Sequence, residues 1–102
     1  MPVPEKIDIL VCYDVKTIHS DGDRRLRQVA KACTQFGQRV QYSVFECTLT
    51  PANLQRMKQK LLAILDPQED SLRIYTLVGP RGRCVETYGR DRWIDFDGPL
   101  IT

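Results

Sequence analysis

The chain is poor in the residues that build metal clusters and disulfide frameworks. Its 102 residues include one histidine and four cysteines, and no two of the cysteines stand at Cys-x-x-Cys spacing. A zinc module or a disulfide scaffold is therefore improbable. Cys12, Cys33 and Cys47 each fall inside an apolar pattern, which is typical of small buried side chains in a reducing cytoplasm.

Long hydrophobic runs and a large charge of one sign are also missing. The strongest apolar run, residues 9–13, is far shorter than a membrane span or the core of a secretion signal. We therefore expect a cytoplasmic protein that has no membrane partner. Because 15 Lys and Arg stand against 13 Asp and Glu, the net charge is only +2. A partner has to be inferred from where the charges lie.

The length and the apolar content suit one folded domain. Of the 102 residues, 42% are hydrophobic, and a chain of this size can bury enough surface to fold alone, although dimerisation would add stability. We expect one domain over residues 1–92. Residues 93–102 show no clear periodicity and are expected to form a C-terminal tail.

The first half of the chain shows the patterns of a strand, a helix and a divided strand. Residues 7–14 carry apolar side chains at both parities, which predicts a central strand covered on both faces. Apolar residues at helical spacing then predict a helix that begins near Ser20 and ends at Gly37. In residues 39–49 the apolar face changes between Val44 and Phe45, so we expect a bend or bulge that makes two strands.

The second half shows a helix followed by strands. Thr50-Pro51 is a cap with proline at the first helical position, and Asp66-Pro67 ends the apolar stripe that follows. Residues 71–78 predict another strand, and residues 84–88 a short edge strand.

The order of these elements predicts the fold class. It is βαββαβ with an extra C-terminal edge strand, an α+β, ferredoxin-like sandwich in which two helices pack on one face of an antiparallel sheet. The first strand is apolar on its uncovered side as well. A second copy of the chain would cover that side, so we expect a homodimer.

Charge is segregated along the chain. Residues 24–39 contain no acid and five basic residues, namely Arg24, Arg25, Arg27, Lys31 and Arg39. Arg24, Arg27 and Lys31 stand at i, i+3 and i+7, away from the apolar stripe, and predict a solvated basic ridge. The ridge is either an ordinary exposed helix face or a phosphate-binding surface. In a dimer it occurs twice, which suits the backbone of a nucleic-acid duplex.

Asp14 is the candidate for metal chemistry. It ends the first predicted strand, a position at which aspartate is more often a turn or cap residue. If the strand lies near a twofold axis, however, Asp14 approaches its own copy, and the two carboxylates need a proton or a cation between them. Mg²⁺ suits such a site, because it accepts one or two carboxylates and keeps several waters. Both interpretations remain open from the residues alone.

Four motifs together resemble a known family. They are YDV at 13–15, RRLRQV at 24–29, GQRVQYSVFE at 37–46 and DSLRIY at 70–75. They are similar to CRISPR-associated protein two, the small nuclease-like subunit of the spacer-acquisition pair. The ending DFDGPLI at 95–101 resembles the type I-C variety.

The resemblance implies a dimeric, Mg²⁺-dependent endonuclease that acts on single-stranded RNA or double-stranded DNA. It implies that Asp14 is the catalytic metal ligand and that Phe45 lies near the active site. It also implies a nucleic-acid-binding role for the basic residues Arg24, Arg25, Arg27 and Arg39, to which the ridge adds Lys31. Family members act with the CRISPR integrase, so the alternative function is a non-catalytic dimeric scaffold that binds duplex DNA and bridges integrase dimers.

Overall fold

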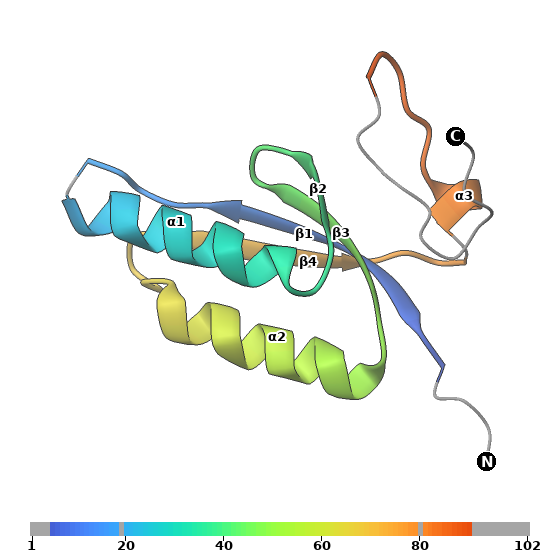
Figure 1. The fold of residues 1–102 in the computed structure, drawn as a ribbon, viewed down its shortest axis with the longest axis horizontal. Helices are drawn as coiled ribbons and strands as arrows, with labels where there is room; N and C mark the ends of the chain where they lie inside the picture. Colours follow the sequence, from blue (N-terminus) through green and yellow to red (C-terminus); the bar gives the residue numbers. More distant parts are fainter. Residues whose placement is uncertain (1–4, 19, 80, 91–102) are drawn as a thin grey trace.

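The computed structural model describes residues 5–18, 20–79 and 81–90. Its elements follow one another in the order that the sequence predicts for a βαββαβ domain (Figure 1). They are β1 (Ile7–Asp14), α1 (Ser20–Thr34), β2 (Gln38–Gln41), β3 (Val44–Leu49), α2 (Pro51–Ile64), β4 (Ser71–Thr76) and α3 (Arg81–Cys84). The predicted α+β, ferredoxin-like fold is therefore confirmed. The expected tail, residues 93–102, lies outside the described residues.

The sheet is antiparallel and has β1 at its centre. The strand order is β2-β3-β1-β4, and α1 and α2 lie on the same side of the sheet (Figure 1). Val11 of β1 pairs with Phe45 of β3 and with Ile74 of β4. Because neighbouring residues of a strand point to opposite faces, these three residues share the face under the helices. Their neighbours point to the other face, which we call the open face.

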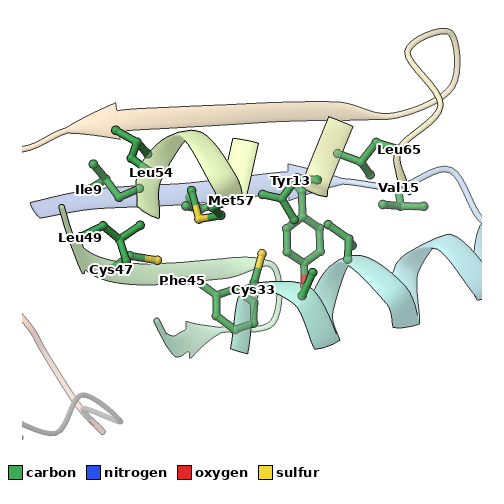
Figure 2. Close-up of a cluster of buried hydrophobic side chains, with 14 residues drawn as sticks. Ile9, Tyr13, Val15, Cys33, Phe45, Cys47, Leu49, Leu54, Met57 and Leu65 are labelled. Carbon is green, nitrogen blue, oxygen red and sulfur yellow. The ribbon is translucent and has the colours of Figure 1, made fainter. Parts of the chain in front are cut away.

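The core lies between the helices and the covered face of the sheet (Figure 2). Its fully buried side chains are Phe45, Ile9, Met57, Leu61, Val11, Val29 and Cys33. Burial raises the pKa of the Cys33 thiol to about 11 and that of Cys47 to about 12. All four cysteines are free. Cys33 and Cys47 are therefore protonated small hydrophobic residues, as their sequence setting predicts.

The second helix begins where the sequence places it. Thr50 is its N-cap, and the Thr50 side chain accepts a hydrogen bond of 3.2 Å from the backbone N–H of Asn53. Pro51 fits the first turn because that position needs no backbone donor. Among the described residues, no helix is long and apolar enough to span a membrane.

The predicted division of residues 39–49 into two strands is confirmed, but the break falls at residues 42–43. Val44 pairs with Cys12 and Phe45 with Val11, so their different faces are the normal alternation of one strand, β3. The irregularity lies in β2, where the register shifts between Arg39 and Gln41. Because this bulge reverses the face to which the later side chains of β2 point, the apolar residues of the segment 39–49 change parity along the sequence.

The predicted edge strand over residues 84–88 is wrong. Its first residue belongs to the single helical turn α3, and the described residues after α3 have no regular secondary structure. The Arg81 guanidinium forms an ion pair with Glu46 of β3, and the Arg81 backbone N–H donates to Asp8 over 3.3 Å. These contacts hold α3 against β1 and β3.

The described residues of the chain cover only part of the open face. Leu10, Cys12 and Val44 of this face line a cavity of about 580 Å³ together with residues 85–88 and Arg90. On the β4 side, Arg73 and Tyr75 are exposed. The unequal cover leaves the part of the face beside β4 accessible, and this is the part that carries Asp14.

Candidate functional site

Asp14 lies on the open face of the sheet at the end of the central strand. It pairs with Ser71 of β4, and it has the same parity as Leu10 and Cys12, so its side chain points away from the helices. Asp14 is exposed. No ion pair among residues 5–18, 20–79 and 81–90 involves it. Its carboxylate is thus accessible from solvent rather than used as a cap.

One chain supplies an incomplete metal site at this position. The described residues contain no group of three or more His, Cys, Asp or Glu side chains that could hold an ion. Mg²⁺ is nevertheless bound in many sites by one or two carboxylates and several waters. A lone exposed carboxylate fits that requirement, and a second copy of Asp14 would complete it.

Arg73 is a cation that the sequence reasoning missed. It lies on β4 opposite Cys12, two residues from Ser71, so it shares the open face with Asp14. The side chain is exposed, and its Nη1–H donates to the Tyr75 hydroxyl over 3.0 Å. The alternation of Ser71, Arg73 and Tyr75 along one strand face is the signal that could have identified it.

The predicted basic ridge lies on the other side of the molecule. Arg24, Arg27 and Lys31 are exposed on α1, and α1 covers the face of the sheet opposite to the open face (Figure 1). The structure therefore does not bring these residues together with Asp14. A phosphate held by the ridge is separated from the Asp14 carboxylate of the same chain by the sheet and the core.

The second helix extends the ridge into a wider basic surface. The α2 sequence PANLQRMKQKLLAI contains three basic residues and no acid, and Arg56 and Lys60 of α2 are exposed. Two shallow depressions of about 350 and 380 Å³ lie between α1 and α2, the first lined partly by Arg24 and the second by Lys31 and Lys60. We call this set the helix-layer basic surface, which consists of Arg24, Arg27, Lys31, Arg56 and Lys60.

Two of the predicted nucleic-acid-binding residues have partners within the chain. The Arg25 guanidinium forms an ion pair with Asp70, at 2.8 Å between Nε and Oδ2. The Arg39 guanidinium lies 5.2 Å from the centre of the Phe45 ring, a distance typical of a cation–π contact. Arg39 itself is exposed. Contact of Arg25 and Arg39 with nucleic acid stays a prediction. The ion pair with Asp70 makes Arg25 the less available of the two for a phosphate.

Phe45 lies in the core under α1. Its exposed fraction is 0%, and its ring stacks on Tyr13 with 6.1 Å between the ring centres (Figure 2). Phe45 and Asp14 point to opposite faces of the sheet. The structure thus shows a packing role for Phe45, while a role beside the active site stays a prediction.

We expect Phe45→Ala to lower the free energy of unfolding by about 3–5 kcal/mol, because it removes a buried ring and leaves a cavity. Phe45→Leu retains most of the apolar volume and is expected to cost much less. Urea unfolding followed by circular dichroism measures both values. A loss below about 1 kcal/mol for Phe45→Ala would be typical of a surface site and would contradict the packing role.

The comparison with known families shows to which family this chain belongs. Residues 8–81 match the family model described as CRISPR associated protein Cas2. The chain belongs to the Cas2 family. The predicted resemblance is confirmed for the family, while the subtype suggested by residues 95–101 stays a prediction.

Close Cas2 relatives cover almost the whole chain. The CRISPR-associated endoribonuclease Cas2 1 of Moorella thermoacetica is 48% identical over 91% of this chain and 97% of its own length. The CRISPR-associated endonuclease Cas2 of Halalkalibacterium halodurans is 46% identical over the same shares. The crystal structure of Streptococcus pyogenes Cas2 superposes with a TM-score of 0.71 at 51% identity, covering 80% of this chain and 99% of that one. The sheet and both helices are therefore those of a Cas2 domain.

Proposed function

We propose that this Cas2-family chain is a homodimeric, Mg²⁺-dependent endonuclease that acts in the cytoplasm on single-stranded RNA or double-stranded DNA. The observation that carries the proposal is the placement of Asp14, an exposed carboxylate with no ion-pair partner among the described residues. It stands at the end of the central strand on the face that the helices leave uncovered. The relatives named endoribonuclease and endonuclease support a nuclease activity.

A dimer through the open face would turn the lone carboxylate into a pair. Residues 85–88 and Arg90 line the cavity over β1, β2 and β3, and no β4 residue lines it, while Arg73 and Tyr75 of β4 are exposed. A twofold axis near the end of β1 would bring Asp14 close to the partner copy's carboxylate. Two such groups repel unless a cation lies between them. Metal binding would therefore stabilise the dimer, and the dimer would complete the metal site.

The protein's own residues would then have separate tasks around the phosphodiester. The two Asp14 carboxylates would hold Mg²⁺, which would supply Lewis-acid activation of the phosphodiester and of the attacking water. Arg73, on the neighbouring strand and the same face, would bind a non-bridging phosphate oxygen and neutralise charge that develops there. Cys12 lies beside both and is half-buried, and burial raises its thiol pKa, so it does not supply a competing thiolate.

The helix-layer basic surface favours a second function. It lies on the opposite side of the sheet from Asp14 and contains five exposed cations, none of which has an ion-pair partner among the described residues. A surface of this kind binds phosphate backbones without reading the sequence. A dimer would carry it twice and would act as a scaffold that binds duplex DNA and bridges CRISPR integrase dimers.

Incubation with a labelled unstructured RNA and a labelled DNA duplex tests the nuclease proposal. We expect fragments with Mg²⁺ and none after EDTA is added, because the carboxylates alone cannot activate water. The same samples run on a native gel report binding. Retarded duplex with no fragments under Mg²⁺ or Mn²⁺ would overturn the nuclease and leave the scaffold.

A further inference from the structure

The Asp70 carboxylate is the most heavily hydrogen-bonded side chain near Asp14. Its exposed fraction is 0%, and that of the Arg25 side chain is 17%. Arg25 donates to both carboxylate oxygens, from Nε over 2.8 Å and from Nη2 over 3.1 Å. The backbone N–H groups of Lys16 and Asp66 also donate to it, over 3.1 and 2.9 Å. The Arg25 bond is the main reason that the pKa of Asp70 lies below its ordinary value.

These bonds join three separate parts of the chain at one end of the sheet. Lys16 belongs to the connection from β1 to α1, Arg25 to α1, and Asp66 to the connection from α2 to β4. In Figure 1 both connections lie at the end of the molecule where α1 begins. Arg25 also donates from Nη2 to the Lys16 carbonyl oxygen, over 3.4 Å.

Asp14 is held from both sides by this arrangement. Asp70 directly precedes Ser71, whose backbone pairs with that of Asp14. Two residues after Asp14, the Lys16 N–H is fixed on the Asp70 carboxylate. The backbone of Asp14 therefore lies between two points that are both anchored on one buried side chain.

The neighbouring backbone confirms that this connection has little freedom. Gly22 of α1 approaches Lys16 and Thr17 so closely that a Cβ at Gly22 would lie 2.8 Å from the Thr17 Cα. Real Cβ atoms are not found at such distances from backbone, so residues 16 and 17 are packed against α1. The bonds from Arg25 and Lys16 to Asp70 fix the same segment from the other side.

We propose that Asp70 and Arg25 form a positioning pair that fixes the Asp14 carboxylate on the open face for its reaction. The proposal rests on the nuclease function proposed above and assigns Arg25 a role through Asp70 rather than through phosphate. In this role neither residue would need to touch substrate or metal. Their effect reaches Asp14 through the strand pairing with Ser71 and through the Lys16 backbone.

The test compares Asp70→Asn and Arg25→Gln with the wild-type protein in three measurements. Steady-state cleavage of a short RNA gives kcat and KM, a Mg²⁺ titration gives the concentration for half-maximal rate, and amide hydrogen exchange reports residues 14–18. We expect both variants to lose at least about tenfold in kcat, because catalysis requires near-ideal placement of the reacting groups. KM should change less than about twofold, the Mg²⁺ requirement should rise, and exchange at residues 14–18 should accelerate.

A control separates positioning from plain loss of stability. Leu54→Val, or Leu54→Ala if needed, changes a core residue at the other end of α2 and is chosen to match the loss of Tm in Asp70→Asn. The control should keep its kcat and Mg²⁺ requirement. Equal losses in the control, or an unchanged kcat in both pair variants, would overturn the proposal. If the wild type cleaves with no divalent cation, the proposal of a Mg²⁺-dependent nuclease fails. The positioning pair is then tested by hydrogen exchange alone, and unchanged exchange at residues 14–18 in Asp70→Asn would overturn it.

Discussion

Asp14→Asn is expected to lower Mg²⁺-dependent cleavage at least about 1000-fold, because it removes the proposed metal ligand, whose loss would cost several kcal/mol of transition-state stabilisation. Asparagine has nearly the same shape, but its neutral amide is a weak ligand for Mg²⁺. The Asp14 side chain is exposed, so the substitution should change the free energy of unfolding by less than about 0.5 kcal/mol. Cleavage of a labelled RNA across a range of Mg²⁺ concentrations, with thermal unfolding in parallel, measures both quantities.

A matched variant controls for the loss of one negative charge. Asp23→Asn removes an exposed carboxylate from the first turn of α1, on the side of the sheet away from Asp14. We expect its cleavage rate to stay within about twofold of wild type, because an exposed charge on the helix side of the sheet is screened at physiological salt. Cleavage that continues unchanged in Asp14→Asn would remove Asp14 from the mechanism, whatever Asp23→Asn does.

The second large effect is expected from the triple change Arg24→Ala, Arg27→Ala and Lys31→Ala. If about five basic groups of the dimer contact phosphates, the logarithm of duplex affinity should fall with the logarithm of salt at a slope of roughly −4 to −5. The triple variant should make this slope shallower by about 3. If the two proteins bind equally at 1 M salt, a slope shallower by about 3 gives the variant about a 1000-fold lower affinity than wild type at 0.1 M salt. Fluorescence anisotropy of a labelled duplex at several salt concentrations measures the slope and the affinity.

The matched control removes the same charge from elsewhere on the surface. Lys6→Ala, Arg83→Ala and Arg90→Ala replace three exposed cations that lie outside both helices of the layer. Alanine favours helix, so the α1 variant should remain folded. We expect the control slope to stay within about 1 of wild type, because these residues lie outside the helix-layer basic surface. Equal slopes for wild type and the α1 variant would show that α1 does not bind the backbone.

Local patterns predicted the central strand and the second helix well. The apolar residues at both parities of β1 reported its central place in the sheet, because both faces of a central strand are covered or contacted. Thr50 and Pro51 predicted the start of α2 to the residue, since a cap and its following proline act within one turn. The face of Asp14 followed from simple alternation along β1.

Contacts between distant residues account for what the sequence could not predict. The turn α3 is held by an ion pair between Arg81 and Glu46, which are 35 residues apart, and no local pattern reports such a bond. The spacing of α1 could not show which arginine would meet a carboxylate 45 residues further on, as Arg25 does with Asp70. The separation of the basic ridge from Asp14 likewise required the layer order of sheet and helices.

The central claim is that cleavage and duplex binding belong to opposite faces of one domain. The most direct test is to measure kcat on a short RNA at saturating concentration, together with duplex affinity, for Asp14→Asn and for the triple α1 variant. We predict that Asp14→Asn binds the duplex with the wild-type salt slope and does not cleave, because a metal ligand acts on the chemical step. The triple variant should keep kcat within about threefold of wild type and lose duplex binding, because cations that contact the phosphate backbone act on affinity. A triple variant that loses kcat as severely as Asp14→Asn would contradict the separation of the two faces.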